Sequence, residues 1–374
     1  MRRLVPAVLG VLFGAGVYLG FGPTAIEPAA WQPPPPTPLA GPYAPNERLK
    51  DVEWWAKALV GPEAITFDAE GRLVTGLKDG RIVRLTPGSD DAVLLADTKG
   101  RPLAIAYHPD GRLFICDAHG GLLALAADGR LEVLATSEGG VPFKFADDLA
   151  IAKDGVVYFT DASARHSIEA FVDDLMEHQT TGRLLKYEPA TKRVTKLADG
   201  FSFANGVALG PDEAYLVMSE TGAYRLWRYW LKGEKAGQKE VFLDALPGFP
   251  DNVRYAPERH VFWVAIGSPR NPLIDRLAEW PGLRKAISRL PKAVQPAPER
   301  HAFVLAVDES GKPVESLQHR AEGSYSPIAS AVERDGWLYF GSFAREGVAR
   351  VRLPELPATP SPEAPPVEPL DPGG

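Results

Sequence analysis

The chain of 374 residues has a single cysteine, Cys116, and fewer basic than acidic residues, 41 lysines and arginines against 48 aspartates and glutamates. One cysteine excludes an intrachain disulfide framework and any CxxC metal motif. The net charge of −7 gives no support for the basic face that binds nucleic acids, so no nucleic-acid partner is expected. Because the histidines form no HxH or HxxxH pair, a zinc site is not expected either.

Motifs of several common enzyme classes are also missing. There is no GxSxG elbow, which disfavours a serine hydrolase of the α/β type. No P-loop or Rossmann glycine fingerprint follows a β-rich run, which disfavours nucleotide chemistry. Long heptads are absent and helical spacing is rare, so the core must be built mostly from strands.

The N-terminus combines Arg2-Arg3 with an uncharged, mostly apolar run from Leu4 to Phe21. As a helix this run would rise about 27 Å, close to the thickness of the hydrocarbon layer. The two arginines favour a cytoplasmic N-terminus. Residues 1–21 are therefore predicted to be a single-pass signal anchor, with the rest of the chain on the periplasmic or extracellular side. A cleaved secretory signal, with Ala29-Ala30 as its site, is the alternative and would give a secreted protein.

Proline is concentrated in two arms beside the central part of the chain. Residues 22–48 contain the four consecutive prolines Pro33–Pro36, which predict a stiff, extended linker that holds the next domain off a surface. Residues 354–374 are rich in proline and glutamate and have too few apolar side chains to fold, so we expect a disordered tail. One folded domain is expected over residues 49–353.

A short unit recurs six times in this domain: an apolar strand, a turn rich in Gly and Asp, and a second strand. The turns lie at 68–71, 108–111, 152–155, 210–213, 256–259 and 333–336, and the strands after them contain Leu73, Leu113, Val157, Tyr215, Val261 and Leu338. Six copies in about 305 residues leave about 51 residues per copy, enough for four strands. The expected fold is all-β, a six-bladed β-propeller with four-stranded blades.

Two insertions interrupt the repeats. Residues 164–181 and 269–299 carry apolar side chains at helical spacing. Amphipathic helices that cap blade edges are one interpretation. The other is a lid over the channel, or a face that lies on a membrane. The apolar residues favour a lipophilic substrate over a polar one.

The register of the repeats selects one position per blade, eight residues before the end of each turn. These positions are Glu63, Leu103, Asp147, Asn205, Asp251 and Ile328. In equivalent blades they lie at one depth and face the central channel. Four of them are oxygen donors, which suit a hard cation such as Ca2+, and three carboxylates without a cation would repel one another. The alternative is a wet channel that holds ordered water.

Several stretches resemble the strictosidine synthase-like family, and the resemblance covers residues 49–353. They include Gly61-Pro-Glu63, Arg101–Ile105, Phe145–Leu149, Phe203–Leu209 and Leu246–Arg254. Related six-bladed enzymes, the gluconolactonases and regucalcin among them, hold Ca2+ through Glu, Asn, Asn and Asp. By position these are Glu63, Asp147, Asn205 and Asp251 here, so an aspartate replaces the first asparagine. Its extra charge should tighten cation binding, weaken the Lewis acidity of the ion and allow another divalent cation.

The resemblance implies a calcium-dependent hydrolase of lactones or aryl esters that attacks a carbonyl polarised by the channel metal. Asp251 is implied as general base or nucleophile, with a role as ligand only as the alternative. His119 resembles the placement of the paraoxonase base, and a loop histidine bonded to a neighbour is its alternative. The segment Ser324–Ser330 offers no glutamate for the condensation of strictosidine synthase itself. The rival function is a non-catalytic binding propeller with a structural Ca2+.

Overall fold

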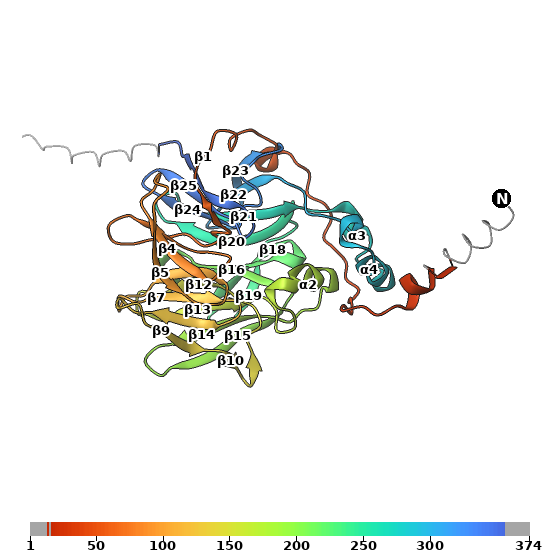
Figure 1. The fold of residues 1–374 in the computed structure, drawn as a ribbon, viewed down its shortest axis with the longest axis horizontal. Coiled ribbons are helices and arrows are strands. Elements are labelled where there is room, and N and C mark those ends of the chain that lie inside the picture. Colours follow the sequence, from red (N-terminus) through yellow and green to blue (C-terminus); the bar gives the residue numbers. More distant parts are fainter. Residues whose placement is uncertain (1–12, 15, 356–374) are drawn as a thin grey trace, which may run out of the picture.

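Each repeated turn closes a hairpin between two strands of an antiparallel sheet (Figure 1). The first turn shows how: the amides of Gly71 and Arg72 donate to the backbone and side-chain oxygens of Asp68, at 3.0 and 2.8 Å. Gly71, Gly111 and Gly155 have φ of +78°, +89° and +89°, a region that favours glycine. This computed structural model describes residues 13–14 and 16–355.

Six four-stranded sheets follow one another along the chain, which confirms the six-bladed β-propeller. Blade 1 consists of β2 (Thr66–Phe67), β3 (Leu73–Gly76), β4 (Arg81–Leu85) and β5 (Ala92–Asp97), and blade 2 of β6 (Pro102–Tyr107), β7 (Leu113–Asp117), β8 (Gly121–Leu125) and β9 (Leu131–Ala135). Blade 3 consists of β12 (Ala146–Ile151), β13 (Val157–Asp161), β14 (Gly182–Glu188) and β15 (Arg193–Phe201), and blade 4 of β16 (Ala204–Leu209), β17 (Tyr215–Glu220), β18 (Arg225–Trp230) and β19 (Lys239–Leu243). Blade 5 consists of β20 (Gly248–Ala256), β21 (Val261–Pro269), β22 (Ala302–Asp308) and β23 (Pro313–His319). A small hairpin, β10 (Ser137–Glu138) and β11 (Val141–Pro142), precedes blade 3.

Blade 6 joins the two ends of the domain. It consists of β24 (Ser330–Arg334), β25 (Trp337–Gly341), β26 (Glu346–Arg352) and, as its outer strand, β1 (Glu53–Val60). Glu53 pairs with Arg350 and Trp55 with Val348. The first strand of the domain therefore completes the last blade and closes the ring.

The hydrophobic core lies between neighbouring blades. Val217 and Leu226 of blade 4 share a buried cluster with Phe262, Val264 and Phe303 of blade 5. Each fully buried side chain of this kind contributes about 1.5–3 kcal/mol. The β-branched and aromatic residues of the second strands, which identified the repeats, are thus the residues that hold adjacent blades together.

Both insertions contain the expected helices. The first holds η2 (Ile168–Ala170) and α2 (Phe171–Glu177), and the second holds α3 (Pro272–Arg276), α4 (Pro281–Ser288) and η5 (Lys292–Val294). Each insertion joins the second strand of its blade to the third. In an antiparallel sheet the second strand ends where the first begins, so both insertions lie on the face where the inner strands start. Short turns also occur as η1 (Gly41–Tyr43), η3 (Pro211–Glu213) and η4 (Thr221–Ala223).

The proline-rich linker differs from the expected free spacer. It is extended, but residues 24–37, here called the strap, run along the propeller surface. The Trp31 ring stacks on His178 at 3.8 Å between centroids, and Ile26 is 1% exposed. Arg270 donates to the carbonyl oxygen of Pro34 at 2.7 Å. Extended proline segments leave their carbonyls unpaired, and these carbonyls and the flanking apolar residues bind the strap to the propeller.

The predicted anchor and tail fall largely outside the described residues. Residues 1–12, 15 and 356–374 are not described, while residues 13–14 and 16–21 are helical. In the part of the chain that the structure describes, no helix is long and apolar enough to cross a membrane.

Candidate functional site

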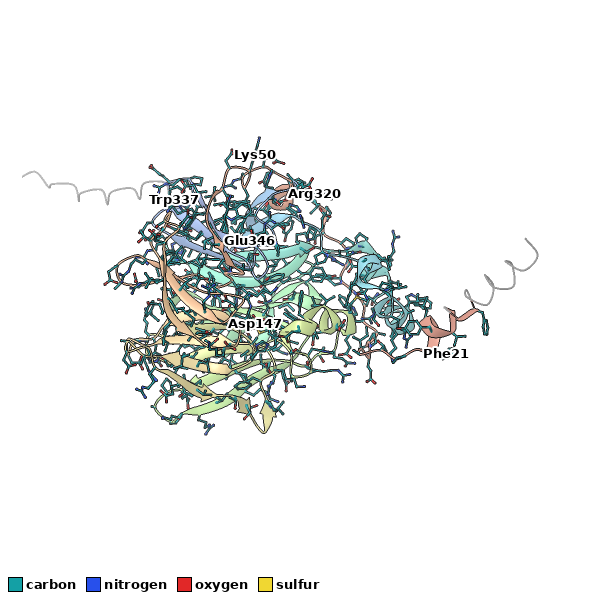
Figure 2. All side chains as sticks on the ribbon, viewed as in Figure 1. Phe21, Lys50, Asp147, Arg320, Trp337 and Glu346 are labelled. Carbon is teal, nitrogen blue, oxygen red and sulfur yellow. The ribbon has the colours of Figure 1, made fainter. Side chains whose placement is uncertain are left out.

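The four oxygen donors lie at the beginnings of inner strands. Asp147 and Asn205 are the second residues of β12 and β16, Asp251 is the fourth residue of β20, and Glu63 precedes β2. All four side chains are buried. Figure 2 places Asp147 near the middle of the propeller. The predicted register therefore brings these residues to one end of the channel.

Three of these inner strands are irregular at the site residue. The pairing of β12 with β13 shifts between Ala146 and Leu149, that of β16 with β17 between Ala204 and Val207, and that of β20 with β21 after Pro250. Such bulges redirect a side chain out of the regular alternation of the strand. They explain why the side chain of a site residue can face the channel although its backbone belongs to the sheet.

The residues that follow the donors lock adjacent blades together. The Asp148 carboxylate accepts two bonds from Arg254, both of 2.6 Å, and one from the backbone amide of Val207 at 2.8 Å. Gly206 lies so close to blade 5 that a Cβ there would be 2.5 Å from the Cα of Asn252. This framework fixes Asp147, Asn205 and Asp251 relative to one another.

The carboxylates of the site raise one another's pKa. Burial raises the pKa of Glu63 to about 7, although the Arg101 guanidinium opposes the shift. Burial and then the charges of Glu63 and Asp251 raise the pKa of Asp147 well above its usual range. The pKa of Asp251 is raised by burial and by Glu63, while a hydrogen bond from Asn205 opposes this. A bound cation would relieve this repulsion.

The amide of Asn205 also fits a cation. Its Oδ1 atom is buried and has no hydrogen-bond partner among the described residues. An amide oxygen and carboxylates are the donors that Ca2+ prefers. The described ranges hold no group of three His, Cys, Asp or Glu side chains arranged as a metal site, so a cation here would depend on the amide as well as the carboxylates.

Arg101 is a site residue that the register did not select. Its Nη2 atom lies 3.0 Å from Glu63 Oε2, and both side chains are buried. The guanidinium also donates to the carbonyl oxygens of Gly61 and Phe343, at 3.0 and 3.1 Å. In the sequence it was marked only as the first residue of Arg101–Ile105, one of the stretches that resemble the strictosidine synthase-like family. The positive charge of the Arg101 guanidinium explains how the Glu63 carboxylate can be buried without a metal.

The insertion of blade 3 covers the channel mouth. Leu103, an apolar register position, belongs to a buried cluster with Phe145 and Phe203, against which Phe171 packs. The Phe171 ring also meets Phe343 of blade 6 edge to face, with centroids 5.7 Å apart. Blades 3 and 6 are on opposite sides of a six-bladed ring, so α2 extends across the mouth.

His119 lies on the exposed rim of the same face. Its Nε2 atom is 2.7 Å from Glu169 of the blade 3 insertion. With Lys144, Arg165 and His166 it lines an open hollow of about 530 Å³. Within the described ranges, no hydrogen bond or ion pair joins His119 to the four buried donors.

Solved structures share the architecture at low identity. A gluconolactonase from Xanthomonas campestris has a TM-score of 0.58 at 18% identity, over 82% of this chain and 91% of that one. A calcium-binding protein, regucalcin, from Agrobacterium tumefaciens has a TM-score of 0.54 at 18% identity, over 78% of this chain and 89% of that one. These likenesses support the fold alone.

Sequence relatives identify the family. Its profiles match as "Strictosidine synthase" over residues 147–234 and "Strictosidine synthase-like, N-terminal" over residues 41–85. Strictosidine synthase-like 13 of Arabidopsis thaliana is 37% identical over 294 residues, 70% of this chain and 72% of the plant protein. The adipocyte plasma membrane-associated protein of Bos taurus is 35% identical over 366 residues, 91% of this chain and 87% of the bovine protein. The chain belongs to the strictosidine synthase-like family.

Proposed function

We propose that this chain is a calcium-dependent hydrolase of lactones or aryl esters. The observation that carries the proposal is the buried set of oxygen donors at the channel mouth, whose carboxylates raise one another's pKa and whose amide oxygen has no partner. The structural neighbours include a gluconolactonase and a calcium-binding regucalcin, so the shared fold is compatible with hydrolysis and with calcium binding.

Glu63, Asp147, Asn205 and Asp251 would hold the ion. When bound, Ca2+ supplies Lewis acidity that favours attack on a carbonyl. Asp251 takes a proton from the attacking water or attacks the carbonyl itself. Asn205 orients Asp251 through the hydrogen bond between their side chains.

The apolar cover over the mouth favours a lipophilic substrate. Phe145, Phe171 and Phe203 present rings around Leu103 at the entrance. These rings would pack against an aryl or alkyl group and keep bulk water away from the ester. For a substrate to reach Asp251, α2 must move as a lid.

The test measures hydrolysis of phenyl acetate and a panel of lactones by the full chain, with Ca2+ and after chelation. Activity should appear with Ca2+ and disappear without it, and Mg2+ and Mn2+ would show whether Asp147 admits another cation. Asn205→Ala should abolish both activity and Ca2+ binding measured by calorimetry. Asp128→Asn, at an exposed carboxylate, is the matched control and should change neither. Full turnover by chelated protein would refute the proposal.

A non-catalytic binding propeller remains the second candidate. The ion pair of Arg101 with Glu63 and the contact of Phe171 with Phe343 favour it, because both tie blades together around the site. In that case Ca2+ should raise the melting temperature, with no hydrolysis of phenyl acetate or of any lactone in the panel.

We also infer that residues 1–21 anchor the chain in a membrane, with the propeller on the extracytoplasmic side. The bovine relative is named as plasma membrane-associated, which supports membrane association. Protease added outside an intact plasma membrane, in cells from which any outer membrane has been removed, should digest the propeller in the membrane fraction. Protection of the propeller, or its release as a shortened soluble chain, would contradict the anchored topology.

A further inference from the structure

We propose that the blade 5 insertion, residues 269–299, is a second membrane contact that rests on the lipid headgroups beside the N-terminal helix. The proposal rests on the N-terminal membrane anchor inferred above, concerns how the propeller is held, and does not depend on hydrolysis in the channel. Figure 1 shows α3 and α4 at the end of the molecule from which the N-terminal segment projects.

The insertion exposes large apolar side chains. Leu273 is 49% exposed, Trp280 61%, Leu283 50% and Val294 64%. Trp280 and Leu283 are three residues apart at the start of α4, which places them on one face. Arg284, the next residue along the helix, is buried, so the exposed surface is limited to the side of Trp280 on which Leu283 lies. Residues of this kind on one side of a short helix suit the boundary between headgroups and acyl chains.

The basic residues of the insertion suit anionic headgroups. Arg276 ends α3 and Lys285 lies in the last turn of α4. Lys292, which begins η5, is 75% exposed at its side chain and lies 3.6 Å from Asp173. A basic and aromatic surface of this kind favours a lipid bilayer over a purely apolar protein partner, because phosphate groups can meet the cations while Trp280 enters the interface.

The N-terminal segment is attached directly to α4. Arg289 donates to the carbonyl oxygen of Leu19 at 2.6 Å, and Thr24 Oγ1 lies 2.8 Å from Ser288 Oγ. The chain from Phe21 to Thr24 spans at most about 11 Å. The headgroup layer is roughly 5–7 Å thick on each side, half the difference between the full bilayer and its hydrocarbon core. If Phe21 reaches the hydrocarbon, Thr24 and the end of α4 that it contacts lie in the headgroup layer or within about 6 Å of its outer edge.

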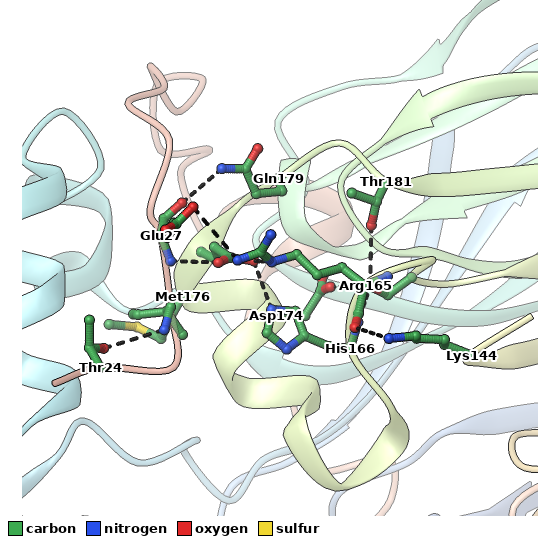
Figure 3. A network of polar contacts seen from close by, with 12 residues as sticks. Thr24, Glu27, Lys144, Arg165, His166, Asp174, Met176, Gln179 and Thr181 are labelled. Atoms are coloured by element: carbon green, nitrogen blue, oxygen red, sulfur yellow. Dashed lines mark hydrogen bonds and ion pairs between the residues drawn. The ribbon is translucent and has the colours of Figure 1, made fainter. Parts of the chain in front are cut away.

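The strap makes this attachment rigid. Glu27 donates its backbone amide to Glu177 Oε1 at 2.5 Å, and the side chain of Gln179 donates to the Glu27 carbonyl at 2.7 Å (Figure 3). Arg284 bridges to Met176 at 2.9 Å and also bonds Ala29. The exit of the N-terminal helix is thus fixed to both insertions, so the distance of α4 from the bilayer is set by the fold.

The N-terminal helix also exposes apolar side chains. Phe13 is 75% exposed, Val17 45% and Phe21 88%. One surface that a bilayer covers would bury both groups of residues together. Both insertions lie on the face where the channel opens, so this contact would turn the mouth toward the lipid. If the proposed hydrolysis also holds, ester substrates would enter from the membrane.

The experiment places an environment-sensitive fluorophore on Leu283→Cys in the full chain, reconstituted in vesicles that contain brominated lipids. The native Cys116 is completely buried and should not react. Val133→Cys is the matched control, because Val133 is 62% exposed on β9 of the opposite blade. We expect the label at position 283 to be quenched at least twofold and shifted to the blue, and the label at 133 to be unaffected.

Equal quenching at positions 283 and 133 would overturn the proposal, and so would failure of the chain to float with the vesicles. A second variant, Trp280→Asp, should reduce quenching at position 283 while the chain still floats, because its N-terminal helix is unchanged. The side chain is exposed, so this substitution tests the contact without removing core packing. Vesicles with and without phosphatidylserine should differ, with deeper quenching on the anionic surface.

Discussion

Asp147 brings a third carboxylate to the buried donors of the channel. Asp147 stands where the resemblance places an asparagine, and its pKa is raised by burial and by Glu63 and Asp251. Without a cation the extra carboxylate works against folding, and with one it strengthens binding. The same residue thus has opposite effects on the metal-free and metal-bound states.

Asp147→Asn should therefore stabilise the chelated protein and weaken Ca2+ binding. We expect a higher melting temperature without metal and about a tenfold loss of affinity, equivalent to about 1.4 kcal/mol. Calorimetric titration and thermal unfolding with and without chelator measure both effects. Glu70→Gln, at an exposed position, should change neither. A lower melting temperature for the chelated variant would show that the Asp147 carboxylate does not destabilise the metal-free fold.

A substitution at Gly206 tests how closely blades 4 and 5 approach each other beside the site. A Cβ at this position would meet backbone atoms of Asn252 and Val253 at 2.5 Å. Because backbone atoms cannot move aside, Gly206→Ala should destabilise the protein by about 3 kcal/mol and separate Asn205 from Asp251. Gly282→Ala, where nothing lies within 4 Å of the new Cβ, should be close to neutral in urea unfolding. Similar stability of the two variants would contradict the close approach.

At the scale of elements, the strap and the insertions form one layer over the channel face. His178, which ends α2 in a left-handed conformation, stacks on Trp31 of the strap and contacts Ser202 of blade 3 at 3.1 Å. Burial, followed by the charges of Arg284 and Arg225, lowers the pKa of His178 to about 3. The histidine stays neutral in this layer at pH values where it is protonated in the unfolded chain.

This layer predicts a loss of stability in mild acid. The unfolded histidine binds a proton below its usual pKa of about 6.5, while the folded one does not until about pH 3. Stability should therefore fall as pH decreases from 6.5, by about 2 kcal/mol at pH 5. His178→Phe keeps the aromatic stack and should lose about 2 kcal/mol less between pH 7 and pH 5 in urea unfolding. Parallel pH profiles for both proteins would exclude His178 as the cause.

At the scale of the whole molecule, the ring is closed twice. The first closure is the pairing of β1 with β26, which joins the two ends of the domain. The second is Arg101, which enters from blade 2 and binds Glu63 and Gly61 next to blade 1 and Phe343 of blade 6. The guanidinium of Arg101 thus connects the blades on both sides of the closure.

Arg101→Gln should leave Glu63 buried without a partner. Breaking a buried ion pair in this way costs about 3–5 kcal/mol, and we expect that loss in the chelated protein. Saturating Ca2+ should recover a large part of it, because the metal replaces the lost positive charge beside Glu63. Arg101→Lys keeps the charge, so the stability of this variant without metal should lie between those of the unchanged protein and Arg101→Gln. Equal losses with and without Ca2+ would show that Arg101 and the metal site are independent.

The periodic part of this structure was determined by the sequence itself. An apolar strand precedes each repeated turn, and a constant offset of eight residues from the end of the turn selected Glu63, Asp147, Asn205 and Asp251, because equivalent blades place equivalent positions at equal depth. The six blades and both helical insertions were predicted for the same reason. Local periodicity needs no knowledge of distant contacts.

The tertiary structure alone decided the features made by residues far apart in the chain. The pairing of Arg101 with Glu63, the reach of Phe171 to Phe343 and the strap on His178 have no period, and each depends on the closed ring. The proline-rich segment predicted extension correctly, but its place against the propeller follows from surfaces that exist only after folding. Sequence spacing specifies what repeats, whereas packing specifies which unique side chains meet.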